Sequence, residues 1–176
     1  STEKVGIGGW SLGGVTSVIE AGARFDLENL RAWCEEDESH AEFFACSDTV
    51  GHEEEIAEFM GLEEVPEGLW PAQNDERIAA AVRLSGSMHW FGEEGLAAIE
   101  TPVLLIHGGQ EEMEDVSLEM GNPYDNAGSE RKAQVVLKDA GHYTFFSSCE
   151  ESPDVYNLSL QIGFPTFCAD SVWDMD

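Results

Sequence analysis

The sequence predicts an α/β fold in which a parallel β-sheet is flanked by helices. Short apolar runs typical of buried strands recur along the chain, and helical or loop segments separate them. This alternation favours parallel strands joined by crossover connections. With 176 residues and 42% hydrophobic composition, the chain has enough apolar material for one sizeable core. We therefore expect a single domain over residues 1–176.

Four apolar runs are the predicted strands. The third is nearly continuous, as expected of a parallel strand buried on both faces. The second is rich enough in alanine to be helical, but the polar residues before it and the Ser/Gly turn after it favour a strand. In chain order the runs cover residues 5–9, 77–84, 101–109 and 133–138.

Two helices are predicted between the stretch after Ser11, which can itself be helical, and the second strand. Asp26 can cap the first, in which Leu27 and Leu30 recur at helical spacing with Trp33 or Cys34. The second covers residues 52–60 and ends at Gly61. The acidic stretch 35–50 is expected to be irregular.

The first strand leads into Gly9-Trp10-Ser11-Leu12-Gly13, which matches the G-x-S-x-G pattern of a nucleophile elbow. In such a turn the serine hydroxyl stands above the sheet, and the flanking glycines let strand and helix backbones pass closely. Ser11 would then lie at a helix N-terminus, where the N–H of Leu12 provides half of an oxyanion hole. The alternative is an ordinary Gly/Ser-rich turn.

A carboxylate and a histidine follow later strands. Acidic residues begin at Glu111, just after the third strand, and His142 follows the fourth. The order serine, acid, histidine is the one found in the triads of one large class of serine hydrolases. His142 would take the proton of Ser11 during attack and return it to the leaving group.

The walls of a substrate pocket are expected near the same ends of the strands. The loop after the second strand carries Met88, His89 and Trp90, and Trp10 adjoins the serine. Open α/β sheets bind ligands at the carboxyl ends of their strands. The alternative for the loop residues is ordinary packing.

The chain is strongly acidic, with 36 Asp and Glu residues against 8 Lys and Arg residues and a net charge of −28. This charge argues against nucleic acid or an anionic membrane surface as a partner. It indicates either a well-solvated surface or adaptation to high salt, where screening relieves self-repulsion. No window has the length of a membrane span or the form of a signal peptide.

Cysteines and histidines leave two further questions open. Bridges from Cys34 to Cys46 and from Cys149 to Cys168 are the simplest pairing and predict a secreted or periplasmic protein. Four free thiols would instead indicate the cytoplasm of a salt-adapted organism. His40 and His52 each lie near carboxylates, which leaves a metal-assisted hydrolase as an alternative, but no spacing is typical of a zinc site. We expect no metal and no cofactor.

Several segments resemble bacterial α/β-hydrolases of the dienelactone-hydrolase-like and platelet-activating-factor-acetylhydrolase-like kind. The similar segments are residues 9–14, 21–26, 102–108, 140–145 and 167–174. The resemblance implies an α/β-hydrolase fold and a serine esterase or lipase-like activity on a small-molecule ester or lipid. Ser11 resembles the nucleophile and His142 the base. A non-catalytic acidic binding or interaction protein on the same fold is the alternative.

The resemblance also implies which residue is the acid. In such enzymes it usually stands three residues after the glycine that ends the strand, which gives Glu111 when counted from Gly108. The usual residue is aspartate, so glutamate is a departure from the pattern. The choice between Glu111 and Glu112 therefore stays open.

The order of the strands follows from the resemblance too. The four predicted strands would be neighbours in chain order, with residues 5–9 at one edge. Such sheets normally have further strands before the elbow strand, and a loop there supplies the second oxyanion donor. The chain is thus expected to be the carboxyl-terminal half of a domain. It would self-associate, or pair with a missing amino-terminal half, through the elbow strand.

Overall fold

Four parallel strands form one sheet in the computed structural model, which describes residues 3–110 and 122–145 together with residues 154, 157, 158 and 161. The strand order is β1-β2-β3-β4, so neighbours in the sheet are neighbours in the chain, as expected. The α/β class with a parallel sheet is confirmed. The strands are β1 (Val5–Trp10), β2 (Ile78–Leu84), β3 (Val103–Gly108) and β4 (Lys132–Leu137).

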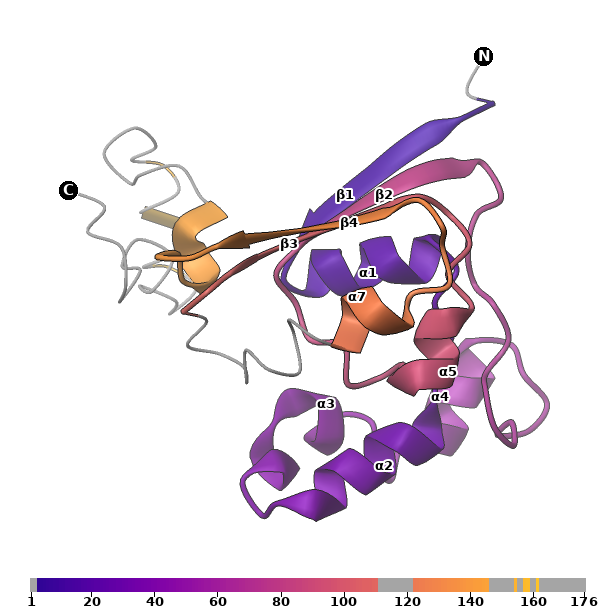
Figure 1. Ribbon diagram of the computed structural model, residues 1–176. Helices are drawn as coiled ribbons and strands as arrows, with labels where there is room; N and C mark the ends of the chain where they lie inside the picture. The colour runs from indigo at the N-terminus through magenta and orange to yellow at the C-terminus, as the bar shows by residue number, and fades with distance from the viewer. Residues whose placement is uncertain (1–2, 111–121, 146–153, 155–156, 159–160, 162–176) are drawn as a thin grey trace.

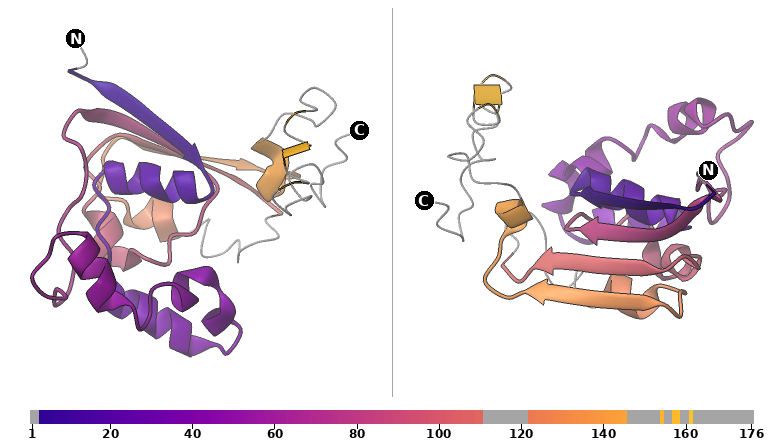
Figure 2. Two further views of the ribbon diagram at one scale, coloured as in Figure 1. Left: turned by 180° about the vertical axis from the view of Figure 1, so that it is seen from behind. Right: turned by 90° about the horizontal axis from the view of Figure 1, so that it is seen from above.

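The described helices between β1 and β4 lie on one side of this sheet (Figures 1 and 2). The helices nearest the sheet are α1 (Leu12–Glu20), α5 (Gly92–Ala97) and α7 (Asn122–Asn126). A second group lies farther from the sheet and consists of α2 (Leu27–Glu36), η1 (His40–Glu42), α3 (Phe44–Ser47) and α4 (Glu53–Phe59). The short helix η2 (His142–Phe145) follows β4 at the carboxyl ends of the strands.

The two faces of the sheet differ in burial. On β3, Val103 and Leu105 are buried, whereas Leu104 and Ile106 are only half-buried. Val135, which pairs with Ile106, is 41% exposed. The expectation that β3 is buried on both faces is therefore met on one face only, because the described helices between β1 and β4 all cover the same face (Figure 2).

Helix α2 begins where its cap residue predicts. The Asp26 carboxylate accepts a hydrogen bond from the backbone N–H of Asn29 at 3.0 Å, an N-cap typically worth about 1 kcal/mol. Leu27 and Leu30 are buried beneath it. Helix α4 is followed, as predicted, by Gly61 at a positive φ of 74°.

The expectation of an irregular segment over residues 35–50 is wrong in part. The helices η1 and α3 lie there, and α3 brings Cys46 to Cys34 of α2 with a Cα–Cα distance of 5.8 Å. This disulfide is one of the two expected bridges. Closing a loop of this length stabilises the fold by about 3 kcal/mol in the chain-entropy view. Cys149 and Cys168 lie outside the described residues.

Two apolar clusters form the interior. The larger lies between the sheet and its helices and includes Val18, Phe91 and Leu105. The smaller is centred on Trp70 and Leu27, beneath α2 and α4. Each cluster belongs to one of the two groups of helices.

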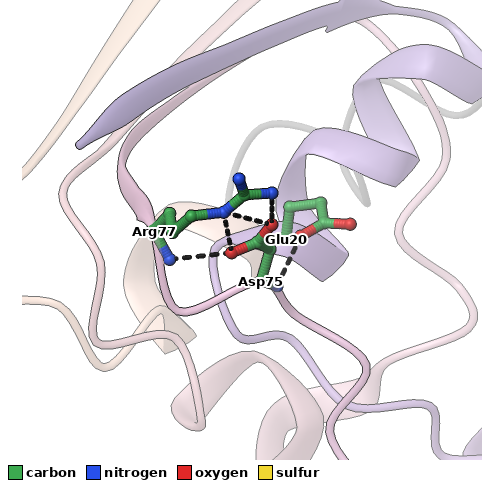
Figure 3. Close-up of polar contacts among 3 residues, drawn as sticks. All are labelled: Glu20, Asp75 and Arg77. Carbon is green, nitrogen blue, oxygen red and sulfur yellow. Dashed lines mark hydrogen bonds and ion pairs between the residues drawn. The ribbon is translucent and has the colours of Figure 1, made fainter. Parts of the chain in front are cut away.

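A polar contact joins the entry of β2 to the end of α1 (Figure 3). The N–H of Asp75 donates to the Glu20 carboxylate at 2.7 Å, and the Asp75 carboxylate pairs with the Arg77 guanidinium at 2.5 Å. The hydrogen bonds from Arg77 lower the pKa of Asp75 to about 2. This contact fixes the connection at the amino ends of the strands, away from Ser11.

In the part of the chain that the structure describes, no helix combines the length and apolar character that a bilayer crossing requires.

Candidate active site

Ser11 lies at the sharp turn between β1 and α1. It is the N-cap of α1, with φ of 56° and ψ of −123°. A non-glycine residue with positive φ is uncommon, and such strain persists only where the surrounding structure holds it. The N–H of Ser11 donates to the carbonyl of Leu84 at 3.0 Å, which anchors the turn to the end of β2. This is the geometry that the G-x-S-x-G pattern predicts.

The glycines around the turn have different roles. A Cβ on Gly9 would overlap the backbone of Gly13, so the close approach expected at the elbow occurs there. A Cβ on Gly13 itself would meet no atom within 4 Å, whereas a Cβ on Gly14 would overlap the carbonyl oxygen of Ser85. The second close approach is therefore at Gly14, one residue later than the sequence pattern predicts.

The end of β2 supports the serine from beneath. Ser85 and Gly86 both have positive φ, 51° and 114°, and a Cβ on Gly86 would overlap the carbonyl oxygen of Ser11. The fully buried Arg83 donates from its guanidinium to the carbonyl of Gly86. Sequence reasoning missed these residues. A charged residue in an apolar strand, followed by Ser-Gly, was the available signal.

His142 reaches the serine from the far end of the sheet. Its Nε2 atom is 3.1 Å from Ser11 Oγ, although 131 positions separate the two residues and their strands form opposite edges of the described sheet. His142 is 4% exposed and begins the helix η2. At this distance the Ser11 hydroxyl can donate to a neutral imidazole.

Trp10 holds the histidine from the other side. Its indole N–H donates to the backbone carbonyl of His142 at 2.8 Å, and the two ring centroids are 4.9 Å apart. Tyr143 packs edge-on against the same imidazole at 5.2 Å. The sequence predicts Trp10 as a pocket wall, and the structure places it against His142.

Two further groups are expected at the site, the oxyanion donor and the acid of the triad. Leu12 is the first residue of α1 and is 57% exposed, and the N–H groups of a first helical turn have no partner within their helix. Glu111 and Glu112 lie outside the described residues.

The expected pocket residues line two cavities. Met88 and His89 line a cavity of about 410 Å³ beside α2, and Trp90 lines another of about 250 Å³ beside α1. In the first, the Trp33 indole is stacked between His40 and His89, with ring centroids 4.1 and 3.7 Å away.

The histidines considered as metal ligands have other contacts. His40 Nδ1 lies 2.8 Å from the carbonyl of Trp33, and His52 Nδ1 lies 3.5 Å from the exposed carboxylate of Glu55 on α4. Over residues 3–110 and 122–145, no three His, Cys, Asp or Glu side chains gather closely enough to hold a metal ion.

Comparison with known proteins adds no assignment. No protein-family model matches the chain, and no curated protein matches it.

Proposed function

We propose that this chain is a serine hydrolase that cleaves carboxylic esters through an acyl-Ser11 intermediate. The observation that carries the proposal is the 3.1 Å contact between Ser11 Oγ and His142 Nε2, made at a strained turn at the N-terminus of α1. A serine beside an imidazole at a helix N-terminus has the nucleophile, the base and one source of oxyanion stabilisation together.

The reaction would proceed in two steps. Ser11 Oγ attacks the ester carbonyl carbon as its proton passes to His142 Nε2, and the N–H of Leu12 faces the negative charge that develops on the carbonyl oxygen. The C–O bond to the alcohol then breaks, and the alcohol leaves with the proton from His142. Water repeats the sequence on the acyl-serine, with His142 again as the base, and releases the carboxylic acid.

We assign the acid that orients His142 to Glu111, with Glu112 as the alternative. A carboxylate in this role fixes the imidazole tautomer and stabilises the imidazolium. The α/β-hydrolase family, with its dienelactone-hydrolase-like and platelet-activating-factor-acetylhydrolase-like members, is likewise part of the proposal. It rests on the similar segments and on the four-stranded parallel order.

Strand β1 lies at one edge of the described sheet, which supports the proposal of a partner strand. The N–H groups of Val5 and Ser11 donate to backbone carbonyls at the two ends of β2. Successive residues of a strand direct their backbone N–H and C=O groups to opposite sides. Those of Gly6 and Gly8 therefore point away from β2. No proline or charge lies within β1 to discourage pairing. We propose that a further strand, from a second copy or from an amino-terminal half, adds at this edge.

Hydrolysis of p-nitrophenyl esters tests the proposal. We expect turnover that is lost in Ser11→Ala and in His142→Gln. A folded protein with no turnover in wild type would favour the second candidate, a non-catalytic binding protein on the same fold.

A further inference from the structure

We propose that the cavity beside α1 binds the uncharged acyl chain of the ester substrate. This inference rests on the proposed hydrolase function for its substrate, but the cavity can be tested without catalysis. The cavity has a volume of about 250 Å³ and lies between the two apolar clusters, since Val15 and Phe91 belong to the larger and Ile56 and Met60 to the smaller. Ligand sites are concave and mostly apolar, so an apolar pocket of this size is suited to a ligand.

The wall of the cavity that α1 forms begins one helical turn from the nucleophile. The N–H of Val15, which lines the cavity, donates to the carbonyl of Ser11 at 3.0 Å, and helical side chains lean back over the preceding turn. A chain attached to Ser11 would therefore enter the cavity at the Val15 end.

The far end of the cavity lies near the end of α1. Ile19 lines it there, as does Gln73, two residues before the Asp75 that bonds to Glu20. A helix rises about 1.5 Å per residue, so the path from Ser11 to Ile19 is about 12 Å long. This length suits a medium acyl chain such as octanoyl rather than acetyl.

The lining and the overall charge select an uncharged chain. Among the described residues that line the cavity, Thr49 and Gln73 are polar, the others are apolar, and none is charged. A charged group buried there would have no ionic partner. The net charge of −28 also disfavours an anionic ligand.

Ester chain length provides the first test. Wild type should hydrolyse p-nitrophenyl octanoate with a kcat/KM at least about tenfold above that for p-nitrophenyl acetate, since each buried methylene contributes a factor of a few. Met60→Trp fills the cavity and should remove this preference, so that the two esters are hydrolysed with similar kcat/KM. Phe59→Trp is the matched control, because Phe59 is 92% exposed on the same helix end, and it should keep the preference.

Direct binding provides the second test. In Ser11→Ala, ω-bromooctanol should quench the fluorescence of Trp90, and the quenched part should be absent in the same protein carrying Trp90→Phe or Met60→Trp. If no variant hydrolyses esters but this quenching is seen, the hydrolase proposal fails and the cavity proposal stands. Ester turnover without chain preference, together with no quenching of Trp90, would overturn the cavity proposal and leave the hydrolase in place.

Discussion

Two adjacent glycines in α1 should differ in how much an alanine substitution changes the free energy of unfolding. Alanine at either position gains the helix propensity of about 1 kcal/mol relative to glycine, so this contribution cancels when the variants are compared. At Gly13 the new Cβ meets nothing within 4 Å. At Gly14 it lies well inside 3.0 Å of the Ser85 carbonyl oxygen and 3.3 Å from Arg83 Cγ. The backbone oxygen cannot move aside as a flexible side chain would, so α1 must shift from β2.

The size of the difference follows from the cost of overpacking, which is typically about 1–3 kcal/mol. We expect Gly14→Ala to be less stable than Gly13→Ala by this amount. In a chain of this length that corresponds to about 2–4 °C in Tm for each kcal/mol.

Urea unfolding followed by circular dichroism measures the difference. Since the shift of α1 also displaces the serine, Gly14→Ala should acylate more slowly with a p-nitrophenyl ester, and Gly13→Ala should react as wild type does. Equal stability of the two variants, or a less stable Gly13→Ala, would refute the packing described at the elbow.

Four further outcomes are expected. Trp10→Phe keeps an aromatic ring but loses the bond to the His142 carbonyl, so kcat should fall with little change in KM and the pH–rate profile should shift. Glu111→Gln should lower kcat by orders of magnitude and Glu112→Gln much less, and the reverse would exchange their roles. Because the folded-state pKa of Asp75 is lowered to about 2, its carboxylate stabilises the fold above about pH 4, and this contribution is lost as pH falls from about 4 to 2. Urea unfolding should thus separate Asp75→Asn from wild type at pH 7 and not at pH 2. The thermal midpoint should rise between low and molar salt, and a midpoint independent of salt would exclude adaptation to salt.

The assembly state can be checked alongside these variants. Sedimentation of the chain should show association that weakens when Gly8→Pro blocks the outward backbone of β1. A monodisperse wild-type monomer with full ester turnover would contradict the proposed strand addition.

Local sequence patterns predict most of the described fold. The apolar runs set the four strands to within one or two residues, and Asp26 and Gly61 mark helix ends because cap geometry is chemically specific. The shorter helices escape prediction because each is too short to show a hydrophobic period; they are η1, α3, α5, α7 and η2. The disulfide between Cys34 and Cys46 was expected as part of the simplest pairing of the four cysteines, and the structure confirms it.

The part of the candidate site that a short motif forms could be predicted from the sequence. The part that depends on contacts between distant segments could not. The turn at Ser11 follows from five consecutive residues. The contacts of Trp10 with His142, and of Arg83 with Gly86, depend on how separate segments meet above and below that turn. No local pattern encodes such a meeting, since it is set by the packing of the whole sheet.

Covalent labelling of Ser11 tests the central claim most directly. The wild-type chain is treated with a fluorophosphonate and its intact mass is compared with those of Ser11→Ala and His142→Gln treated alike. The account predicts one adduct on wild type, located at Ser11 by peptide mapping, with none on Ser11→Ala and much slower labelling of His142→Gln. A folded wild-type chain that stays unmodified, or one modified equally in the Ser11→Ala variant, would contradict it.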